Sequence, residues 1–462
     1  MTTQSKIVVI GMMSGAFSAF AAGFGLYEGS ARGNALGGGL VGKAADASAN
    51  FYNPATLTDL TNTVVTVGMT TEHPKADTTV DGHKTGKMDA GGFVLPHLYL
   101  AQPLPYDFVF GLGIAPEYGL GTHYHQDWPL AWDTRQTTIE GIVFNPNLAY
   151  RVTDDWSVSA GIRLMYFSFD QYADKMAISH GDSYGTIRDH LKGDNGMIDW
   201  GWQLSTKYDI TKKLSVGVMY KSFIDVKVKG YNHTRVRSYD DSALAPQVAA
   251  GVKAALQQAG LTPGNPVYDQ YYRTAYKNAY SQAVGSAHSQ VKSGAESADG
   301  AASAKLRLPQ SLTLGLNYDL TDDWHFGLAA TWTEWSSIDS IHFSLPGDND
   351  KDLPLKWNDV WRVGGGVAYD ITDNLTFMTS YVYDVDPCSK YHGTTMLPPG
   401  SRHVGTVGFG YKLGAFDLGV SYGLVFMNGR ELSIEDGLGH SYRFNTRNGL
   451  SHAASVTMSY SF

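Results

Sequence analysis

The chain has 462 residues, a formal net charge of −9 and 52 glycines. Only 17% of its residues are charged, against roughly a quarter in typical soluble domains, while 12% are aromatic. A single cysteine excludes a disulfide framework, and the acidic balance gives no electrostatic footprint for nucleic acid.

The N-terminal segment, residues 1–21, has the pattern of a secretory signal peptide. Lys6 precedes an apolar stretch from Ile7 to Ala22, and Ala19-Phe-Ala21 supplies the small residues of a cleavage site. We therefore expect cleavage directly after this motif. A membrane anchor is the alternative, but the apolar run is short for a span and no stop-transfer flank follows it.

The second segment, residues 22–61, does not alternate between apolar and polar positions. It is rich in Gly, Ala and Asn, and the run Gly37–Gly42 makes a helix unfavourable. Irregular backbone is tolerated at membrane depth where it is buried in a protein lumen. We therefore expect a compact plug, or hatch, packed inside the structure that residues 62–462 form.

Residues 62–462 alternate with a period of two, which predicts β-strands. The apolar positions end in Tyr and Trp, as at a membrane–water boundary. A soluble sandwich also alternates, but it places its apolar residues inside. The expected strands number fourteen: 62–73, 89–103, 106–118, 136–151, 154–169, 198–209, 212–231, 304–319, 323–343, 354–370, 374–385, 402–413, 415–428 and 447–462.

The connections between these segments alternate between short and long. Short polar turns such as Tyr150–Trp156 and Tyr318–Trp324 recur, and long connections at 170–197, 344–353 and 429–446 lie between them. Transmembrane barrels of bacteria have an even strand number, short periplasmic turns and long outer loops. The pattern therefore predicts an all-β fold, a 14-stranded antiparallel transmembrane β-barrel with its N-terminal hatch in the lumen.

The longest connection, residues 232–303, has the pattern of two helices. Its second half carries a row of tyrosines four residues apart, which places them on one helical face. This row has two interpretations: it lines a groove that binds an amphipathic ligand, or it packs one helix on its partner. The residues concerned are Tyr268, Tyr272 and Tyr276.

The last strand ends in an apolar face that includes Tyr460 and the terminal Phe462. Outer-membrane barrels commonly end in this way, and the barrel assembly machinery recognises such ends. We therefore expect that machinery to be a partner through Phe462, with outer-membrane lipid and lipopolysaccharide as the surroundings of a monomer.

The hatch residues resemble the beginning of the FadL family, outer-membrane transporters of long-chain fatty acids and, in related branches, aromatic hydrocarbons. The resemblance rests on Gly23–Glu28, the glycine run, Asp46 and above all Asn53-Pro-Ala55, and it extends over the mature chain. It implies substrate capture between outer loops, a pocket near the mature N-terminus, hatch rearrangement, and lateral exit at a kink in the third strand.

The resemblance also implies roles for individual residues. Phe24 matches the N-terminal aromatic residue that reaches the pocket, and hatch packing is its alternative role. Pro116 and Gly119 would kink the third strand, since Pro removes a ladder donor and Gly weakens pairing; a plain strand end is the alternative. The remaining hatch residues, expected to be structural to gating, are Glu28, Asn53 and Pro54.

A fatty-acid carboxylate would require a cation in the lumen. By the alternation, Arg163 and Arg362 point inward at mid-strand, and Lys221, Arg307 and Lys356 point inward nearer the outer rim. A lumen salt bridge is the alternative role for each of them, with Asp107, Asp417, Glu28 or Asp46 as the partner. Because each cation has this alternative role, a neutral hydrocarbon remains an alternative substrate.

The expected function is therefore passive uptake of hydrophobic molecules, most simply long-chain fatty acids, across the outer membrane of a Gram-negative bacterium. An aromatic hydrocarbon channel is the alternative, and a surface adhesin or structural barrel is a weaker one. No catalytic set, metal site or cofactor is expected, and no nucleic-acid partner.

Overall fold

The computed structural model describes residues 23–125, 127–179, 182–196, 199–347, 350–388, 394–396, 400–436 and 439–462. The segment expected to be a signal peptide, residues 1–21, lies outside the described residues. Among the described residues, no helix combines the length and the apolarity needed to span a membrane.

Fourteen antiparallel strands form a closed barrel wall, which confirms the expected fold class. The wall closes where the first strand pairs with the last, from Val64 opposite Ser461 to Val80 opposite Phe444. In wall order the strands are β1 (Val64–Val80), β3 (Phe93–Pro103), β4 (Phe108–His123), β5 (Gln136–Thr153), β6 (Trp156–Ser179), β8 (Asp199–Thr211), β9 (Leu214–Lys221), β12 (Ser311–Asp319), β13 (Trp324–Thr333), β16 (Val360–Thr372), β17 (Leu375–Asp384), β18 (Arg402–Leu413), β19 (Phe416–Met427) and β21 (Ser441–Ser461).

Shorter strands extend the wall beyond its outer end. One series pairs in the order β6, β7, β10, β11, β14, β15, and so the expected loop 170–197 is in fact the end of β6 and a paired strand. The expected loop 429–446 likewise contains strand structure. The strands of this extension are β2 (His83–Asp89), β7 (Asp182–Asp194), β10 (Ile224–Tyr239), β11 (Gly300–Leu308), β14 (Ser340–Ser344), β15 (Lys351–Pro354) and β20 (Arg430–Glu435).

Neighbouring wall strands are interrupted at one level, between the barrel and its outer extension. The interruptions fall at 222–223, at 309–310 and at 334–339, where the 3-10 helix η2 (Trp335–Ser337) is inserted. Three expected strands, 212–231, 304–319 and 323–343, are therefore each divided in two. The alternation also changes phase: between 214 and 221 the lumen-facing residues are odd-numbered, and from 224 to 228 the buried residues are even-numbered.

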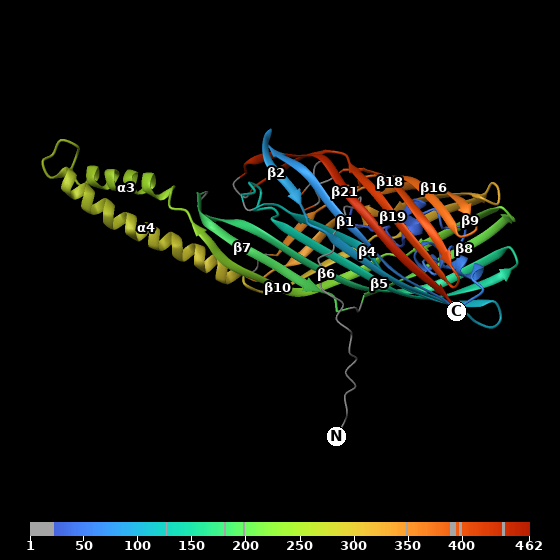
Figure 1. Ribbon diagram of the computed structural model, residues 1–462. Coiled ribbons are helices and arrows are strands. Elements are labelled where there is room, and N and C mark those ends of the chain that lie inside the picture. Colours follow the sequence, from blue (N-terminus) through green and yellow to red (C-terminus); the bar gives the residue numbers. More distant parts are fainter. Residues whose placement is uncertain are drawn as a thin grey trace, which may run out of the picture.

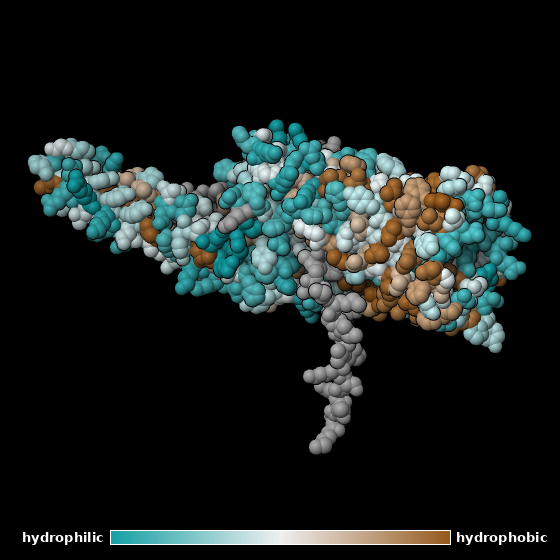
Figure 2. Space-filling model, viewed as in Figure 1, coloured by the Kyte–Doolittle hydropathy of each residue, from teal (hydrophilic) through white to brown (hydrophobic). Residues whose placement is uncertain are grey.

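The outward face of the wall is apolar over the half nearer the C-terminus. Trp200, Leu204 and Ile162 are each more than half exposed, at 63%, 51% and 51%. Figure 2 shows hydrophobic residues gathered over one half of the barrel, whereas the half toward the helices is hydrophilic. Because a lipid-facing surface must be apolar, the apolar half is the membrane-spanning part.

The hatch lies inside the barrel and consists of α1 (Ala31–Ala35), α2 (Ala49–Tyr52) and η1 (Pro54–Asp59). The Ser30 side chain accepts a hydrogen bond from Gly33 N and so caps the first helix. Between the helices, hatch backbone lies directly on wall backbone. A Cβ added to Gly39 would come within 2.7 Å of the Gly327 carbonyl carbon, so both positions require glycine.

Two helices, α3 (Leu244–Gln258) and α4 (Tyr268–Ala298), form an antiparallel hairpin between β10 and β11. Figure 1 shows this hairpin projecting from the outer end of the barrel, at the opposite end from the C-terminus. Within the described residues, the last turns of α4 hydrogen-bond to β10: Asn232 Nδ2 donates to Ala298 O at 3.0 Å, and Thr234 Oγ1 donates to Ala295 O. The His288 ring of α4 also stacks on Tyr239 of β10 at a centroid distance of 3.8 Å. The expected helices in 232–303 are therefore present.

Candidate functional site

The third wall strand, β4, contains a bulge. Its register with β5 slips between Pro116 and Tyr118, so that Glu117 faces no residue on the neighbouring strand. Pro116 supplies no amide hydrogen for the ladder, which suits an interrupted position. The expected kink at Pro116 and Gly119 thus coincides with a bulge.

The first described residues of the hatch add a short strand to β4 at this bulge. Leu26 N donates to Glu117 O at 2.8 Å, and Gly119 N donates to Phe24 O at 2.8 Å. A Cβ on Gly119 would lie 2.9 Å from the Leu26 side chain, so the glycine permits the close approach. Hatch and bulge are therefore joined by backbone hydrogen bonds.

The Phe24 ring lies in an aromatic cluster and is 1% exposed. Its ring centroid is 5.1 Å from that of Trp335, in an edge-to-face arrangement, and 5.8 Å from those of Trp357 and Tyr118. Gly23, with a φ of +69°, allows the chain to turn here, since a Cβ would lie 2.6 Å from the Trp335 ring. The cluster fills the level at which the wall strands break.

A small cavity of about 20 Å³ lies beside the Phe24 ring. Every residue that lines it is apolar. Such a surface binds hydrocarbon and excludes an unpaired polar group. The other lining residues are Ile139, Phe167, Phe169, Val228, Ala304, Leu306, Ile341, Phe343, Leu355, Trp357 and Met396.

A second cavity, of about 110 Å³, lies next to the first and shares Phe343 and Met396 with it. In contrast to the first, it carries charge. The charged residues that line it are Asp133, Lys175, Asp189 and Lys351. The two cavities together thus present an apolar part and a polar part to one ligand.

The acids of the second cavity are not equivalent. Asp133 Oδ2 already accepts hydrogen bonds from Thr395 N and Thr395 Oγ1, both at 2.7 Å. Asp189 lies in the outer extension, where burial raises the pKa of its carboxyl and the two lysines oppose that shift. Lys175 Nζ donates to a backbone carbonyl, Trp132 O, at 3.2 Å. The second cavity therefore brings two lysines and two acids together, and both lysines act on the Asp189 carboxyl.

Lys175 and Lys351 were not expected at the site, because both lie in segments expected to be loops. The signal was present, since the inward alternation of β6 continues from Phe167 and Phe169 through Ala173. This pattern continues beyond the membrane-spanning length and so extends the strand past its expected end.

Arg163 points into the lumen and is 1% exposed. Its Nη2 lies 2.5 Å from Glu117 Oε2, and its Nη1 donates to Ser222 O at 2.9 Å. Lys221 Nζ lies 3.0 Å from the other oxygen of Glu117. The salt-bridge partner of Arg163 is thus Glu117, the bulge residue, and not one of the four acids expected from the sequence.

Arg362 lies elsewhere in the lumen, with its guanidinium 4.4 Å from the Tyr27 ring centroid. It lines a lumen cavity of about 70 Å³, together with Glu117 and Lys221. Nearby, Glu28 Oε2 accepts a hydrogen bond from Tyr27 N at 2.8 Å. Arg362 therefore lies in a cavity separate from the one beside Phe24.

The expectations that Arg307 and Lys356 point into the lumen were wrong. Arg307 is exposed on the outer face and pairs with Asp225, because the phase changes at the 309–310 break. Lys356 is also exposed, has a φ of +48° and lies 3.1 Å from Asp339.

Asn53 joins the hatch to the wall and is fully buried. Its Nδ2 donates to Val41 O at 2.6 Å and to Thr206 O of β8 at 3.1 Å, while its Oδ1 accepts from Ala55 N at 3.0 Å. Pro54 is the first residue of η1. Because proline lacks an amide hydrogen, this helix start has one donor fewer that needs a partner.

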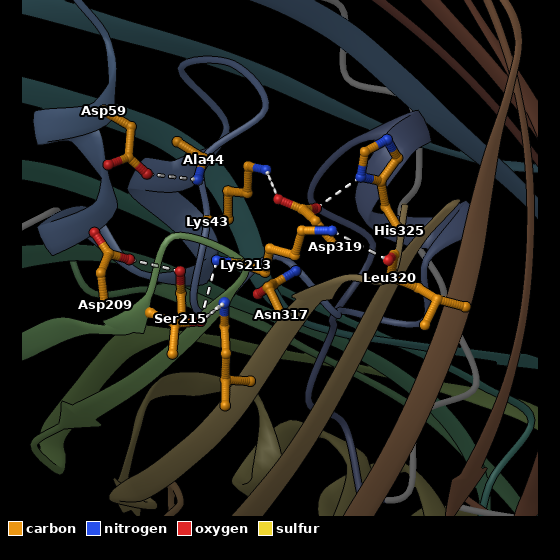
Figure 3. Close-up of polar contacts among 12 residues, drawn as sticks. Lys43, Ala44, Asp59, Asp209, Lys213, Ser215, Asn317, Asp319, Leu320 and His325 are labelled. Atoms are coloured by element: carbon orange, nitrogen blue, oxygen red, sulfur yellow. Dashed lines mark hydrogen bonds and ion pairs between the residues drawn. The ribbon is translucent and has the colours of Figure 1, made fainter. Parts of the chain in front are cut away.

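The periplasmic end of the hatch is held by side-chain contacts (Figure 3). Lys43 Nζ lies 2.6 Å from Asp319 Oδ2, and the other oxygen of Asp319 lies 2.6 Å from His325 Nδ1. Ala44 N donates to Asp59 Oδ2 at 3.3 Å. The Lys43 side chain is 48% exposed, so this ion pair contributes modestly to stability.

The tyrosine row of α4 lies far from these cavities. Tyr268, Tyr272 and Tyr276 stack with centroid distances of 6.0 and 5.9 Å on the projecting hairpin, and they line none of the cavities described above. The structure thus does not bring them together with Phe24, Arg163 or Arg362.

Comparison with known proteins adds the evolutionary relationship. Residues 12–462 match the family described as outer membrane protein transport protein (OMPP1/FadL/TodX). A long-chain fatty acid transport protein of Escherichia coli O6:H1 is 22% identical over 470 residues, covering 95% of this chain and 93% of that protein. Outer membrane protein P1 of Haemophilus influenzae is 24% identical over 361 residues, covering 77% and 70% of the two chains.

Solved structures have the same fold. A FadL homologue from Pseudomonas aeruginosa aligns with a TM-score of 0.76 and 21% identity, over 95% of this chain and 100% of that one. The toluene transporter TodX of Pseudomonas putida aligns with a TM-score of 0.64 and 16% identity, over 97% and 100%. The chain therefore belongs to the OMPP1/FadL/TodX family of outer-membrane transport proteins of Gram-negative bacteria.

Proposed function

We propose that this protein is a passive channel for hydrophobic molecules, with long-chain fatty acids as its substrates. The observation that carries the proposal is the adjacency of the two cavities at Phe343 and Met396. An acyl chain would occupy the apolar cavity beside Phe24, and its carboxylate would lie between Lys175 and Lys351. The relatives named for fatty acid transport support the same substrate class.

The route through the wall would follow the hatch. Substrate captured between the outer loops would reach the Phe24 cavity and displace that ring. Because Phe24 and Leu26 bond to β4 at its bulge, displacement would free the Glu117 to Gly119 backbone. Lateral exit at Pro116 to Gly119 would then follow, with Asn53 and Pro54 keeping the rest of the hatch seated. Glu28 would move with the released segment.

Arg163 and Arg362 take different roles in this proposal. The Arg163–Glu117 pair would hold the bulge in place until the hatch moves. Arg362 would offer a second cation to the carboxylate in the lumen, once the Tyr27 ring no longer covers it. Tyr268, Tyr272 and Tyr276 would act only in the first capture, at the far outer end.

Aromatic hydrocarbons are the second candidate substrates. The cavity beside Phe24 has no polar lining residue, and this suits a neutral ring as well as an acyl chain. In that case the lysines of the second cavity would be dispensable. A role as an adhesin or structural barrel would use the helical hairpin and leave both cavities without a purpose.

Uptake of radiolabelled oleate and toluene in a transporter-null strain tests the proposal. We expect oleate uptake to fall in Phe24→Ala, in Asn53→Ala and in the double variant Lys175→Gln/Lys351→Gln. The matched control Lys253→Gln/Lys277→Gln changes two exposed lysines of the hairpin and should leave uptake unchanged.

Toluene uptake without oleate uptake would move the protein to the hydrocarbon branch. Uptake of neither, from a barrel shown to be folded by its heat-dependent electrophoretic mobility, would contradict the transport proposal. Loss of oleate uptake in the control variant would contradict the assignment of the two cavity lysines.

A further inference from the structure

The outer face of the wall extension carries a ladder of lysines on three neighbouring strands. Because the alternation changes phase at 222–223 and at 309–310, residues that would otherwise face the lumen lie on the outer surface. All four lysines are exposed, and we call them the lysine ladder. They are Lys192 of β7, Lys227 and Lys229 of β10, and Lys305 of β11.

Two of these lysines face each other directly. Lys227 is the antiparallel partner of Lys305, and like charges in this position destabilise a sheet. Within the described part of the chain, no carboxylate oxygen lies within 4.0 Å of the Nζ of Lys227, Lys229 or Lys305. The structure thus concentrates positive charge here without neutralising it internally.

Of the four acids around the ladder, three lie against ladder residues and one is engaged by Arg307. Asp225 binds Arg307 through both oxygens, at 2.7 and 3.1 Å. Asp170 lies 3.6 Å from Lys192, and Asp194 is the register partner of Lys229. Asp199 Oδ2 accepts from Lys227 N, a backbone group, at 3.1 Å. Asp170 thus pairs with Lys192, and within the described residues no ion pair neutralises Lys227, Lys229 or Lys305.

The ladder begins where the lipid-facing surface ends. Phe223 and Trp202 are exposed aromatic residues at the top of the apolar surface, and the Arg307 guanidinium lies 4.4 Å from the Phe223 ring centroid. Exposed aromatic residues of this kind mark the membrane–water boundary. Figure 2 shows the hydrophilic half of the barrel starting beside the apolar one. The lysines therefore lie at the height of lipid headgroups in the outer leaflet.

We propose that the lysine ladder binds the phosphate groups of lipopolysaccharide, the phosphorylated glycolipid of the outer leaflet. Lysine binds phosphate as a point charge, and basic residues beside an anionic leaflet each strengthen the attraction. A fixed phosphate between Lys227 and Lys305 would relieve their mutual repulsion. It would also replace the divalent cations that otherwise neutralise such phosphates. This lipid is a permanent neighbour of the wall and not a transported substrate.

Native mass spectrometry of the detergent-purified full chain, with EDTA present, tests the proposal. The probes are bisphosphorylated lipid A, the same lipid after phosphatase treatment, phosphatidylglycerol and inorganic phosphate. We expect Lys227→Gln/Lys229→Gln/Lys305→Gln to weaken binding of bisphosphorylated lipid A by at least about tenfold. The dephosphorylated lipid should bind wild type and variant equally.

The matched control is Lys84→Gln/Lys253→Gln/Lys277→Gln, which removes three exposed lysines away from the ladder and should bind as wild type does. Heat-dependent electrophoretic mobility checks that each barrel is folded. Unchanged lipid A binding in the ladder variant would overturn the proposal. So would equal affinity for phosphatidylglycerol, or displacement by inorganic phosphate, because either would show a site for any anion. Oleate uptake is independent of these outcomes.

Discussion

At the scale of single residues, the most constrained side chain is Glu117. One carboxylate at the bulge of β4 compensates Arg163 and Lys221, and its backbone carbonyl also accepts the hatch hydrogen bond. A buried pair of this kind adds little relative to an apolar core, but removing one partner leaves a charge buried alone. The bulge therefore depends on one acid.

Replacing this acid gives the first prediction. Glu117→Gln should lower the free energy of unfolding in detergent by roughly 3–5 kcal/mol, because Arg163 then stays buried without a counter-charge. Glu431→Gln removes an exposed partner of Arg443 at 3.5 Å and should cost at most ~1 kcal/mol. Denaturant titration measures both losses of unfolding free energy. Equal losses would show that Glu117 contributes no more to stability than the exposed Glu431 does.

Cys388 gives a prediction for the connection 386–401. Burial raises the pKa of its thiol to about 12, so at pH 8 it is protonated and a poor nucleophile. We expect iodoacetamide to alkylate native Cys388 at least about a hundredfold more slowly than a cysteine placed at exposed Ser242. The rate should rise as the pH approaches the pKa of the thiol. Rapid labelling of native Cys388 at pH 8 would contradict its burial.

At the scale of elements, the α3–α4 hairpin is nearly independent of the barrel. His288 Nε2 of α4 lies 2.9 Å from Oδ1 of Asp241, which precedes α3, so the two ends of the hairpin contact each other close to the wall. The bonds from Asn232 and Thr234 reach only the last turns of α4. The outer part of the hairpin can therefore be removed without disturbing these contacts.

Excision of residues 245–287, with a short Gly-Ser linker in their place, should leave the barrel folded and heat-modifiable. This variant lacks Tyr268, Tyr272 and Tyr276. Because the row is proposed to act in the first capture, oleate uptake should fall more than about twofold below wild type, and Tyr272→Ala/Tyr276→Ala in the intact chain should reproduce the loss. Uptake within about twofold of wild type would instead show that the row serves only helix packing.

The sequence predicted most of the elements because a period of two is a local signal. It failed where that period changed phase, at 222–223 and 309–310, since alternation continues on both sides and only its register differs. The expectation that Arg307 faces inward failed for this reason. A search for phase changes near Pro309 would have found the break.

The candidate site was less accessible to prediction. Phe24 and the bulge at Pro116 could be anticipated from resemblance and from proline chemistry. The joining of β6, β14 and β15 residues around two cavities depends on the register of strands distant in sequence, which no local pattern encodes. Lys175 and Lys351 illustrate this, because they are far apart along the chain and line the same cavity.

At the scale of the whole molecule, the barrel depends on the meeting of its first and last strands. Phe462 N donates to Thr63 O at 2.9 Å, and its ring is exposed beside Tyr460 at a centroid distance of 4.8 Å. The side chain itself contributes few internal contacts, since Phe462 is 71% exposed. Its exposure leaves it available to the assembly machinery.

Phe462→Ala should therefore lower the amount of folded barrel in the outer membrane several-fold, whereas Phe462→Tyr should retain it. Stability of the purified alanine variant should change by less than ~1 kcal/mol, because little of the ring is buried. Quantitative immunoblotting of heat-modifiable protein measures the first effect, and denaturant titration the second. Equal yields of both variants would contradict recognition through this residue.

The backbone contact between Gly39 and Gly327 has a consequence for how the protein can evolve. Neither position can gain a side chain unless its partner retreats, so substitutions here cannot be compensated by a change at the opposite glycine. In a library of all single and paired substitutions at Gly39 and Gly327, we expect no substituted variant to fold. A second substitution should not restore folding, because no pair of side chains fits between the two backbones. A side chain at either position thus requires that the hatch backbone itself shift away from the wall.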